Sequence, residues 1–194
     1  MVRSVKESLL PGGPVALGPF DLVRPLGRGG MAEVLLATHR SDGDKVAVKV
    51  LTGARAREEA FIRALKNEIH NVARLHHPGI ILVFDTGEVD RQAEDMSGGR
   101  LAAGSPWFAM ELASHGALSP KRLPLPWATS RMLLLSLLDA LAHAHARGVI
   151  HRDLKPGNVL VCAPEDPRPG LKLTDFGIAA PLSEGIDESA EEGR

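Results

Sequence analysis

Apolar and polar residues alternate along the first part of the chain in a pattern that predicts β-strands. Residues 20–36 read as strand, glycine-rich turn and strand, which favours a hairpin. The next run, Lys45–Leu51, has a strict period of two, so Ala47 and Lys49 share one face and the valines occupy the other. A lysine opposite a glycine-rich hairpin can reach a ligand bound between them.

Two longer stretches carry apolar residues at helical spacing instead. In residues 57–75 the steps of four, three and four place four side chains on one face: Phe61, Leu65, Glu68 and Val72. A carboxylate in an apolar stripe is costly unless it is paired, and Lys49 is the candidate partner of Glu68. The alternative is a glutamate at the edge of the stripe that reaches solvent. Residues 131–146 are leucine-rich over a wide face, which predicts a helix buried on several sides.

The remaining pattern is of short strands separated by loops. Strands are expected over residues 80–84, 106–113, 159–162 and 171–174. Residues 90–104 are polar and contain glycines, so we expect a surface insertion there, and residues 114–126 are loop-like. Residues 1–19 are punctuated by glycine and proline and predict a flexible leader before the fold begins near Phe20.

Composition places the chain among globular proteins, since 44% of its 194 residues are hydrophobic and 24% are charged. The net charge of -1 gives no basic field for nucleic acid, so no nucleic-acid partner is expected. The single cysteine, Cys162, suits a reducing cytoplasm and reads as a buried strand residue. The first ten residues contain no secretory signal, and residues 133–138 are too short to span a bilayer, so we expect a cytoplasmic chain whose membrane anchor, if one exists, lies outside it.

The densest polar stretch is residues 151–158, which read His-Arg-Asp-Leu-Lys-Pro-Gly-Asn between a helix and a strand. A polar loop held between two buried elements is a common mount for catalytic groups, although a plain connecting turn explains it equally well on its own. By contrast, the adjacent His76 and His77 point in different directions and have no Cys or carboxylate ligands nearby, so they do not indicate a zinc site.

The glycine-rich stretch, residues 26–34, reads Leu-Gly-Arg-Gly-Gly-Met-Ala-Glu-Val. Glycines allow close approach of the backbone and leave N–H groups free for phosphate oxygens, but a hairpin turn requires no ligand. A dinucleotide-binding turn would lead into a helix, and here the following segment is strand-like, which weighs against a Rossmann arrangement. After the last predicted strand comes Asp175-Phe176-Gly177, a carboxylate, an apolar residue and a flexible hinge.

In this order, these motifs resemble those of a protein kinase of the Hanks type, and the wording of the glycine loop and of Asp-Phe-Gly-Ile-Ala is similar to bacterial serine/threonine kinases. The resemblance runs from about Phe20 to the end of the chain. It implies an α+β, two-lobed kinase-like fold. Residues 20–113 would form a complete β-rich N-lobe with one main helix and the hinge, and residues 114–194 a partial helical C-lobe with the catalytic loop and the start of the activation segment.

The resemblance also implies a role for each motif residue, with ATP and Mg²⁺ (or Mn²⁺) as cofactors and a serine- or threonine-containing protein as substrate. Asp153 would accept the proton of the substrate hydroxyl, Lys155 would steady the γ-phosphate, and Lys49 would be held by Glu68. Asn158 and Asp175 would hold the metal. The nucleotide would contact Leu26, Gly27, Arg28, Gly29, Gly30, Val34, Ala47, Lys49, Met110, Glu111, Ala113 and Leu160.

Lys155, two residues after Asp153, is similar to serine/threonine rather than tyrosine kinases and disfavours a small-molecule kinase of similar fold. Arg152 suggests control by a phosphorylated loop, for which Ser183 and Ser189 are candidates. Two positions depart from the family pattern. Ala32 stands at the third glycine of the loop, and Ala117 stands where many kinases carry an acidic ribose contact.

No Ala-Pro-Glu occurs before the last residue, Arg194. We therefore expect a catalytic domain truncated in its activation segment, with the apolar face of residues 131–146 exposed. This leaves two functions open. The chain is either a serine/threonine protein kinase, or a catalytically silent module that binds nucleotide or regulates a partner.

Overall fold

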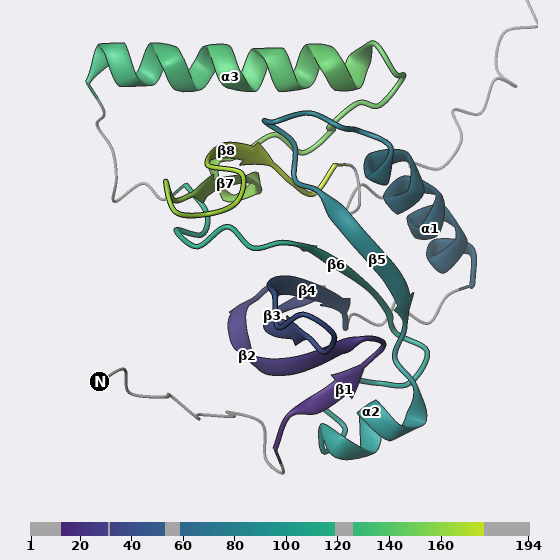
Figure 1. Cartoon of the computed structure of the whole chain (residues 1–194). Coiled ribbons are helices and arrows are strands. Elements are labelled where there is room, and N and C mark those ends of the chain that lie inside the picture. The colour runs from purple at the N-terminus through teal and green to yellow at the C-terminus, as the bar shows by residue number, and fades with distance from the viewer. Residues whose placement is uncertain (1–12, 31, 53–58, 119–125, 177–194) are drawn as a thin grey trace, which may run out of the picture.

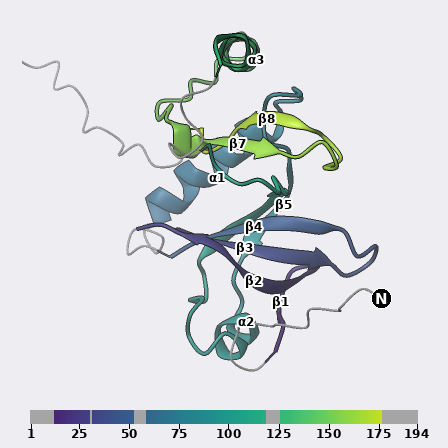
Figure 2. The same ribbon diagram turned by 90° about the vertical axis from the view of Figure 1, so that its left-hand side faces the viewer.

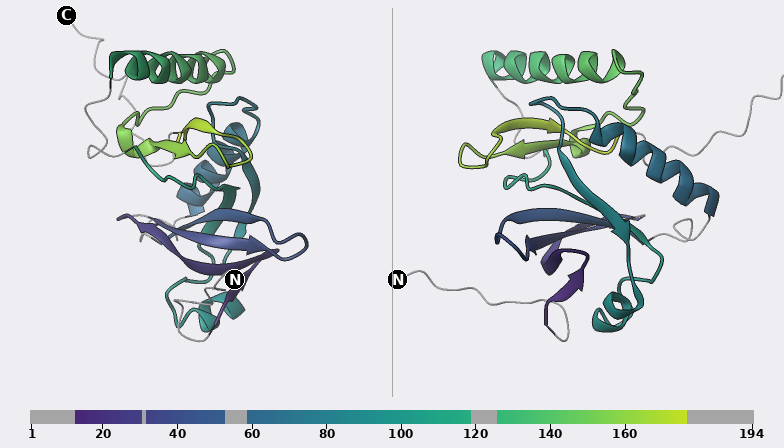
Figure 3. Two further views of the ribbon diagram at one scale, coloured as in Figure 1. Left: turned by 60° about the vertical axis from the view of Figure 1, so that its left-hand side comes forward. Right: turned by 45° about the vertical axis from the view of Figure 1, so that its right-hand side comes forward.

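Figure 1 shows the computed structural model of the chain, which describes residues 13–30, 32–52, 59–118 and 126–176. A six-stranded antiparallel sheet with the order β1-β2-β3-β4-β6-β5 forms the first part. Its strands are β1 (Val15–Leu17), β2 (Phe20–Arg28), β3 (Ala32–His39), β4 (Lys45–Leu51), β5 (Val83–Glu88) and β6 (Pro106–Glu111). Helix α1 (Glu59–Ala73) follows β4 in sequence and lies beside β5 (Figures 1 and 3). The helix and strands β2, β3, β4 and β6 lie within a few residues of their predicted ranges.

The second part is built on the antiparallel hairpin of β7 (Val159–Cys162) and β8 (Gly170–Leu173). Figures 1 and 2 show this hairpin between the large sheet and the long helix α3 (Trp127–His145). A short 3₁₀ turn, Pro156–Asn158, leads into β7. The two parts together form the two-lobed α+β arrangement that was expected.

The alternation along β4 sorts its residues between two cores. Val46, Val48 and Val50 pack into the core on the outer face of the sheet, whereas Ala47 belongs to a second cluster on the inner face, together with Ile69 of α1 and others. Because successive strand residues point to opposite faces, Lys49 lies on the same inner face as Ala47, as predicted. The inner face is the one that borders the cleft described below.

The insertion between β5 and β6 is more ordered than its polar composition suggested. It contains helix α2 (Arg91–Met96), whose N-cap Asp90 accepts a hydrogen bond from the Ala93 N–H at 2.7 Å. Ala93 and Leu101 are buried in the outer core, and α2 packs against β1 (Figures 1 and 3). The segment is an insertion between two strands, as predicted, and it also packs apolar side chains into the core on the outer face of the sheet.

Two strand boundaries also differ from prediction. The leader predicted over residues 1–19 is wrong for Val15–Leu17, which form β1, with Val15 and Leu17 fully buried. The strand predicted over residues 80–84 begins instead at Val83. The preceding apolar residues are buried but pair with the other hairpin, since the Ile81 N–H donates to the Leu173 carbonyl at 2.9 Å.

Helix α3 begins four residues earlier than predicted and is buried on one side only. Ala140 and Ala144 pack into the cluster around β7 and β8, with other residues of that face partly buried. The opposite side exposes large apolar side chains, namely Trp127, Met132, Leu134, Leu135 and Leu138. The expectation of a helix buried on several sides is wrong, whereas the expectation of an exposed apolar face is confirmed. Among the described helices none is long and apolar enough to cross a membrane.

Candidate active site

A cleft of about 670 Å³ lies between the inner face of the large sheet and the β7–β8 hairpin. Eleven of the twelve residues predicted to contact nucleotide line it, and the exception is Gly30. The lining further includes Arg24, Lys45, Leu112, Ser114 and Thr174, which no motif indicated. The cleft is thus enclosed by the residues expected for nucleotide, although this arrangement alone does not test what they bind.

The roof of the cleft is the glycine-rich hairpin between β2 and β3. Residues Leu26 to Gly30 are exposed, and the turn is closed by a hydrogen bond from the Gly29 N–H to the Ala32 carbonyl at 2.8 Å. Ala32 itself is buried against the inner core. The residue that replaces the third glycine therefore fills space beneath the hairpin, while the glycines before it leave the backbone open to the cleft.

The hinge, residues 111–113, and the segment after it join the roof of the cleft to its floor. Met110 and Glu111, at the end of β6, line the cleft, and Ala117 forms an isolated bridge with Leu160 of β7. The Leu118 N–H donates to the Val159 carbonyl at 2.7 Å. Ala117 stands at the cleft wall without a polar side chain, so an acidic ribose contact is absent at this position.

Lys49 lines the cleft from the sheet, and its partner Asp175 lines the opposite side. Its Nζ donates to Asp175 Oδ1 at 2.6 Å, and the two side chains are 12% and 27% exposed. A partly buried ion pair of this kind is screened less than a surface pair. The pairing of Lys49 with Glu68 stays a prediction, because the Glu68 side chain lies outside the described part of the structure.

The loop over residues 151–158 lies at the floor of the cleft, which its Gly157 lines, and its hydrogen bonds are mostly internal. Asp153 Oδ2 accepts from Lys155 Nζ at 2.7 Å and from Asn158 Nδ2 at 3.0 Å. Asn158 Nδ2 also donates to the Asp153 carbonyl at 2.8 Å, and the Thr174 N–H donates to the Asn158 carbonyl at 3.0 Å. Asn158 therefore links the loop to Thr174, the residue that directly follows β8.

The charge on Asp153 is favoured by these contacts. The hydrogen bond from Lys155, followed by that from Asn158, lowers the pKa of the Asp153 carboxyl, so the group is ionised at neutral pH. Within the described residues its Oδ1 accepts no hydrogen bond, because both donors use Oδ2. A carboxylate with one oxygen fixed and the other free is well arranged to accept a proton.

Two residues of the floor adopt positive φ angles that side chains other than glycine rarely take. Arg152 has φ 58° and Asp175 has φ 60°. Such conformations persist where the surroundings determine them, and here His151 beside Arg152 is buried and stacks on Phe176 with ring centroids 4.6 Å apart. Asp175, which has one of these strained conformations, forms the ion pair with Lys49. Both strained residues belong to the motifs singled out in the sequence.

The donor set fits a hard divalent cation. Asn158 uses its Nδ2 for hydrogen bonds and retains Oδ1, while Asp175 gives one oxygen to Lys49 and retains the other. Oxygen ligands of this type suit Mg²⁺, which is bound through one or two carboxylates together with substrate phosphates. Within the described residues no group of three or more His, Cys, Asp or Glu could hold a metal, so the paired histidines form no such cluster.

His77 instead has structural partners. Its Nδ1 accepts from the Gly79 N–H at 3.0 Å, and its Nε2 lies 3.1 Å from Asp139 Oδ2 on α3. Cys162 is buried at the end of β7, and burial raises the pKa of its thiol to about 11. Neither residue therefore contributes a reactive group to the cleft.

A six-stranded antiparallel sheet and a second part built on a hairpin and a long helix enclose one cleft, which is the two-lobed arrangement expected of a kinase-like fold. The profile of the family described as Protein kinase domain matches residues 20–193. The chain belongs to the protein kinase family.

Relatives and solved structures agree with that family. Probable serine/threonine-protein kinase PknB of Bifidobacterium longum is 33% identical over 183 residues, which are 88% of this chain and 24% of that protein. Serine/threonine-protein kinase PrkC of Bacillus subtilis is 33% identical over 173 residues, 86% of this chain and 24% of that protein. The crystal structure of the Mycobacterium tuberculosis PknI kinase domain matches with a TM-score of 0.68 and 32% identity, covering 86% of this chain and 63% of that one. The chain thus spans about a quarter of the length of these curated relatives.

Proposed function

We propose that the chain binds ATP with Mg²⁺ in the cleft and transfers the γ-phosphate to serine or threonine hydroxyls of a protein substrate. The observation that carries this proposal is the arrangement of Lys49, Asp153, Asn158 and Asp175 at one cleft. Lys49 and Asp175 line the cleft and form an ion pair, and a hydrogen bond joins Asp153 to Asn158 in the loop whose Gly157 also lines it. Kinship with serine/threonine kinases supports the choice of substrate class.

The reaction follows from the charges of the site. The substrate hydroxyl oxygen forms a bond to the γ-phosphorus, the bond from that phosphorus to the β,γ-bridging oxygen breaks, and ADP leaves. Asp153 accepts the hydroxyl proton, which its free oxygen and its ionised state allow. Lys155, 2.7 Å from that carboxylate, would neutralise the transferred phosphate.

Lys49 is proposed to exchange partners when nucleotide binds. Its Nζ now contacts Asp175, and the α- and β-phosphates would offer it further oxygens on the same side of the cleft. Mg²⁺, held by Asn158 and Asp175, would supply positive charge against the phosphate oxygens. Adenine would lie between the apolar residues Val34 and Leu160, which line opposite walls.

The proposed setting is the cytoplasm, where ATP and reduced thiols are abundant, and the buried Cys162 thiol suits it. No nucleic-acid partner is proposed because the net charge is -1.

The test compares binding with transfer. Mg-ATP should raise the melting temperature of the chain, and radiolabelled γ-phosphate should appear on serine or threonine of a generic protein substrate. Binding without transfer would favour the second candidate, a catalytically silent nucleotide-binding module. Absence of both would overturn the proposal. ATP without Mg²⁺ is the control, and it should stabilise the chain less.

A further inference from the structure

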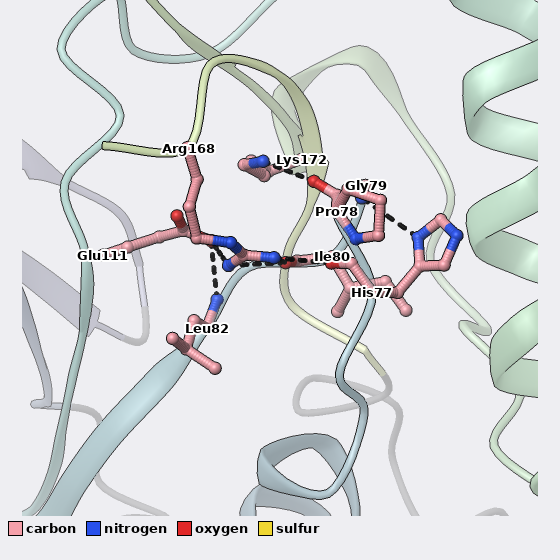
Figure 4. Close-up of polar contacts among 8 residues, drawn as sticks. All are labelled: His77, Pro78, Gly79, Ile80, Leu82, Glu111, Arg168 and Lys172. Atoms are coloured by element: carbon pink, nitrogen blue, oxygen red, sulfur yellow. Dashed lines mark hydrogen bonds and ion pairs between the residues drawn. The ribbon is translucent and has the colours of Figure 1, made fainter. Parts of the chain in front are cut away.

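A cluster of charged side chains joins the end of β6 to the turn between β7 and β8 and to residues 77–82 (Figure 4). Its centre is Glu111, the last residue of β6, whose side chain is only 10% exposed. Arg168, from the turn between β7 and β8, donates from Nη1 to Glu111 Oε1 at 2.5 Å. None of the motifs of the cleft includes this arginine.

Arg168 joins three segments that are remote in sequence. Besides Glu111, its Nη2 donates to the His77 carbonyl at 2.6 Å, and both terminal nitrogens lie 3.5 Å from the Ile80 carbonyl. Figure 4 shows the guanidinium between Glu111 and this backbone segment. The planar fork of arginine suits such a set of acceptors, whereas the single ammonium of lysine cannot reach all of them at once.

Glu111 also completes the ladder between β5 and β6. Its N–H donates to the Leu82 carbonyl at 2.9 Å, and its Oε1 accepts from the Leu82 N–H at 2.8 Å. The side chain therefore stands in for a strand carbonyl just before β5 begins at Val83. The position of the hinge backbone depends on where this carboxylate is held.

A second cation supports the same cluster from β8. Lys172 is almost fully buried, and its Nζ donates to the Pro78 carbonyl. Burial lowers the pKa of Lys172 and raises that of Glu111, which Leu82 and Arg168 oppose by stabilising the ionised carboxylate. A buried charge in this cluster costs free energy unless it is paired, so the geometry of the contacts to Glu111 is constrained.

The cluster connects the two walls of the cleft. The hinge at Glu111 continues from the roof, and the hairpin that carries Arg168 also carries Leu160, which lines the floor. Arg168 therefore links the hinge backbone at Glu111 to the hairpin that carries Leu160, and so constrains the distance between these two walls of the cleft. Asp153 and Lys155 make no contact with it within the described residues.

We propose that Arg168 is a positioning residue for the nucleotide: by holding Glu111 it sets the hinge against the floor of the cleft. This inference rests on the proposed function for its nucleotide, but the anchoring of the hinge can be measured without any nucleotide. It assigns Arg168 an effect on nucleotide affinity rather than on the transfer step.

The experiment uses the full chain with Arg168→Met, Arg168→Lys and the double variant Arg168→Met with Glu111→Met. Arg131→Met, an exposed arginine on α3, is the matched control. Hydrogen exchange without nucleotide should be at least about tenfold faster at the Leu82 and Glu111 amides of Arg168→Met, and unchanged in α2.

Binding of Mg-ATP should weaken about tenfold in Arg168→Met and less in Arg168→Lys, with KM raised and kcat within about twofold. In the double variant the melting temperature should recover in part, because the buried carboxylate that lost Arg168 is removed as well, while the affinity should stay low. A purely structural role predicts that affinity recovers together with the melting temperature.

The inference would be overturned by wild-type exchange at Leu82 and Glu111 in Arg168→Met, by wild-type affinity in that variant, or by recovery of affinity in the double variant. If the unchanged chain bound no Mg-ATP, the proposed function would be wrong. The exchange measurement would then decide by itself whether Arg168 anchors the hinge.

Discussion

The glycine-rich hairpin and the loop over residues 151–158 border the same cleft, but they are held in different ways. The hairpin exposes Leu26 to Gly30 and closes its turn with a backbone hydrogen bond from Gly29. The loop is buried at both ends, at His151 and Asn158, and the Asp153 carboxylate is fixed by two side-chain donors. The floor is preorganised, whereas the roof is open.

This difference matches the chemistry proposed for each wall. Stabilising charge in a transition state requires groups that are already in position, because reorganisation during the reaction costs free energy. Covering phosphates requires backbone that can approach a ligand and then release it. Strain at Arg152 and Asp175 belongs to the floor, where the surrounding hydrogen bonds can sustain it.

The strongest test of the floor is Asp153→Asn. An amide cannot accept the hydroxyl proton, so transfer should fall about 10³-fold while the Kd for Mg-ATP changes by less than about twofold. Single-turnover transfer and calorimetry measure the two quantities. Asp139→Asn, an exposed carboxylate on α3, is the control. Transfer within tenfold of wild type in Asp153→Asn would remove this residue from the mechanism.

Lys49→Met tests the link between the two walls. Loss of Nζ leaves Asp175 without its partner and removes a charge from the phosphate site, so transfer should fall about 10²-fold. The assay is steady-state transfer at saturating ATP. Lys66→Met is the matched change, since its pair with Glu88 is exposed and contributes little. Equal effects of the two substitutions would show that the ion pair of the cleft has no special role.

Acid should destabilise the loop over residues 151–158, which contains His151, before it affects the glycine-rich hairpin. Burial lowers the pKa of His151, so the unfolded chain takes up a proton at this residue at higher pH than the folded chain does. Stability is therefore lost as the pH falls below the unfolded value of about 6.5. Urea unfolding at pH 7 and pH 5.5 should show a larger loss for wild type than for His151→Phe, which keeps the ring contact with Phe176. A greater loss in the variant would contradict the assignment.

The smallest effect is expected in the roof. Ala32→Gly restores the third glycine and removes a buried methyl group, so stability should fall by about 0.5–1 kcal/mol and the Kd for Mg-ATP should change less than about threefold. Ala37→Gly, on the same strand but packed in the outer core, is the control. A tenfold change in affinity for Ala32→Gly would mean that the roof is as rigidly specified as the floor.

Much of this arrangement could be predicted from local patterns. The period of two along β4 placed Lys49 on the inner face, and the spacing within residues 151–158 determined which side chains share the floor. The order of the motifs led, through the resemblance to protein kinases, to the prediction of a two-lobed fold. These features are encoded within short stretches of sequence, which is why inspection of the sequence found them.

What could not be predicted depends on partners that are distant in sequence. Ile80 and Ile81 have the apolar pattern of a strand, but they pair with Leu173 of β8, a choice that periodicity does not encode. Asp90 is a favourable N-cap residue for α2, but the polar composition of residues 90–104 drew attention away from this signal. Arg168 lies in a proline-rich turn 91 residues from His77, and no local signal marks it as a partner of Glu111.

The contrast between a preformed floor and an open roof is tested most directly by hydrogen exchange of the full chain with and without Mg-ATP. The account predicts that the amides of residues 151–158 are protected before nucleotide is added and change little, whereas those of residues 26–34 become protected on binding. Equal gains of protection in both walls, or a gain confined to the floor, would contradict it.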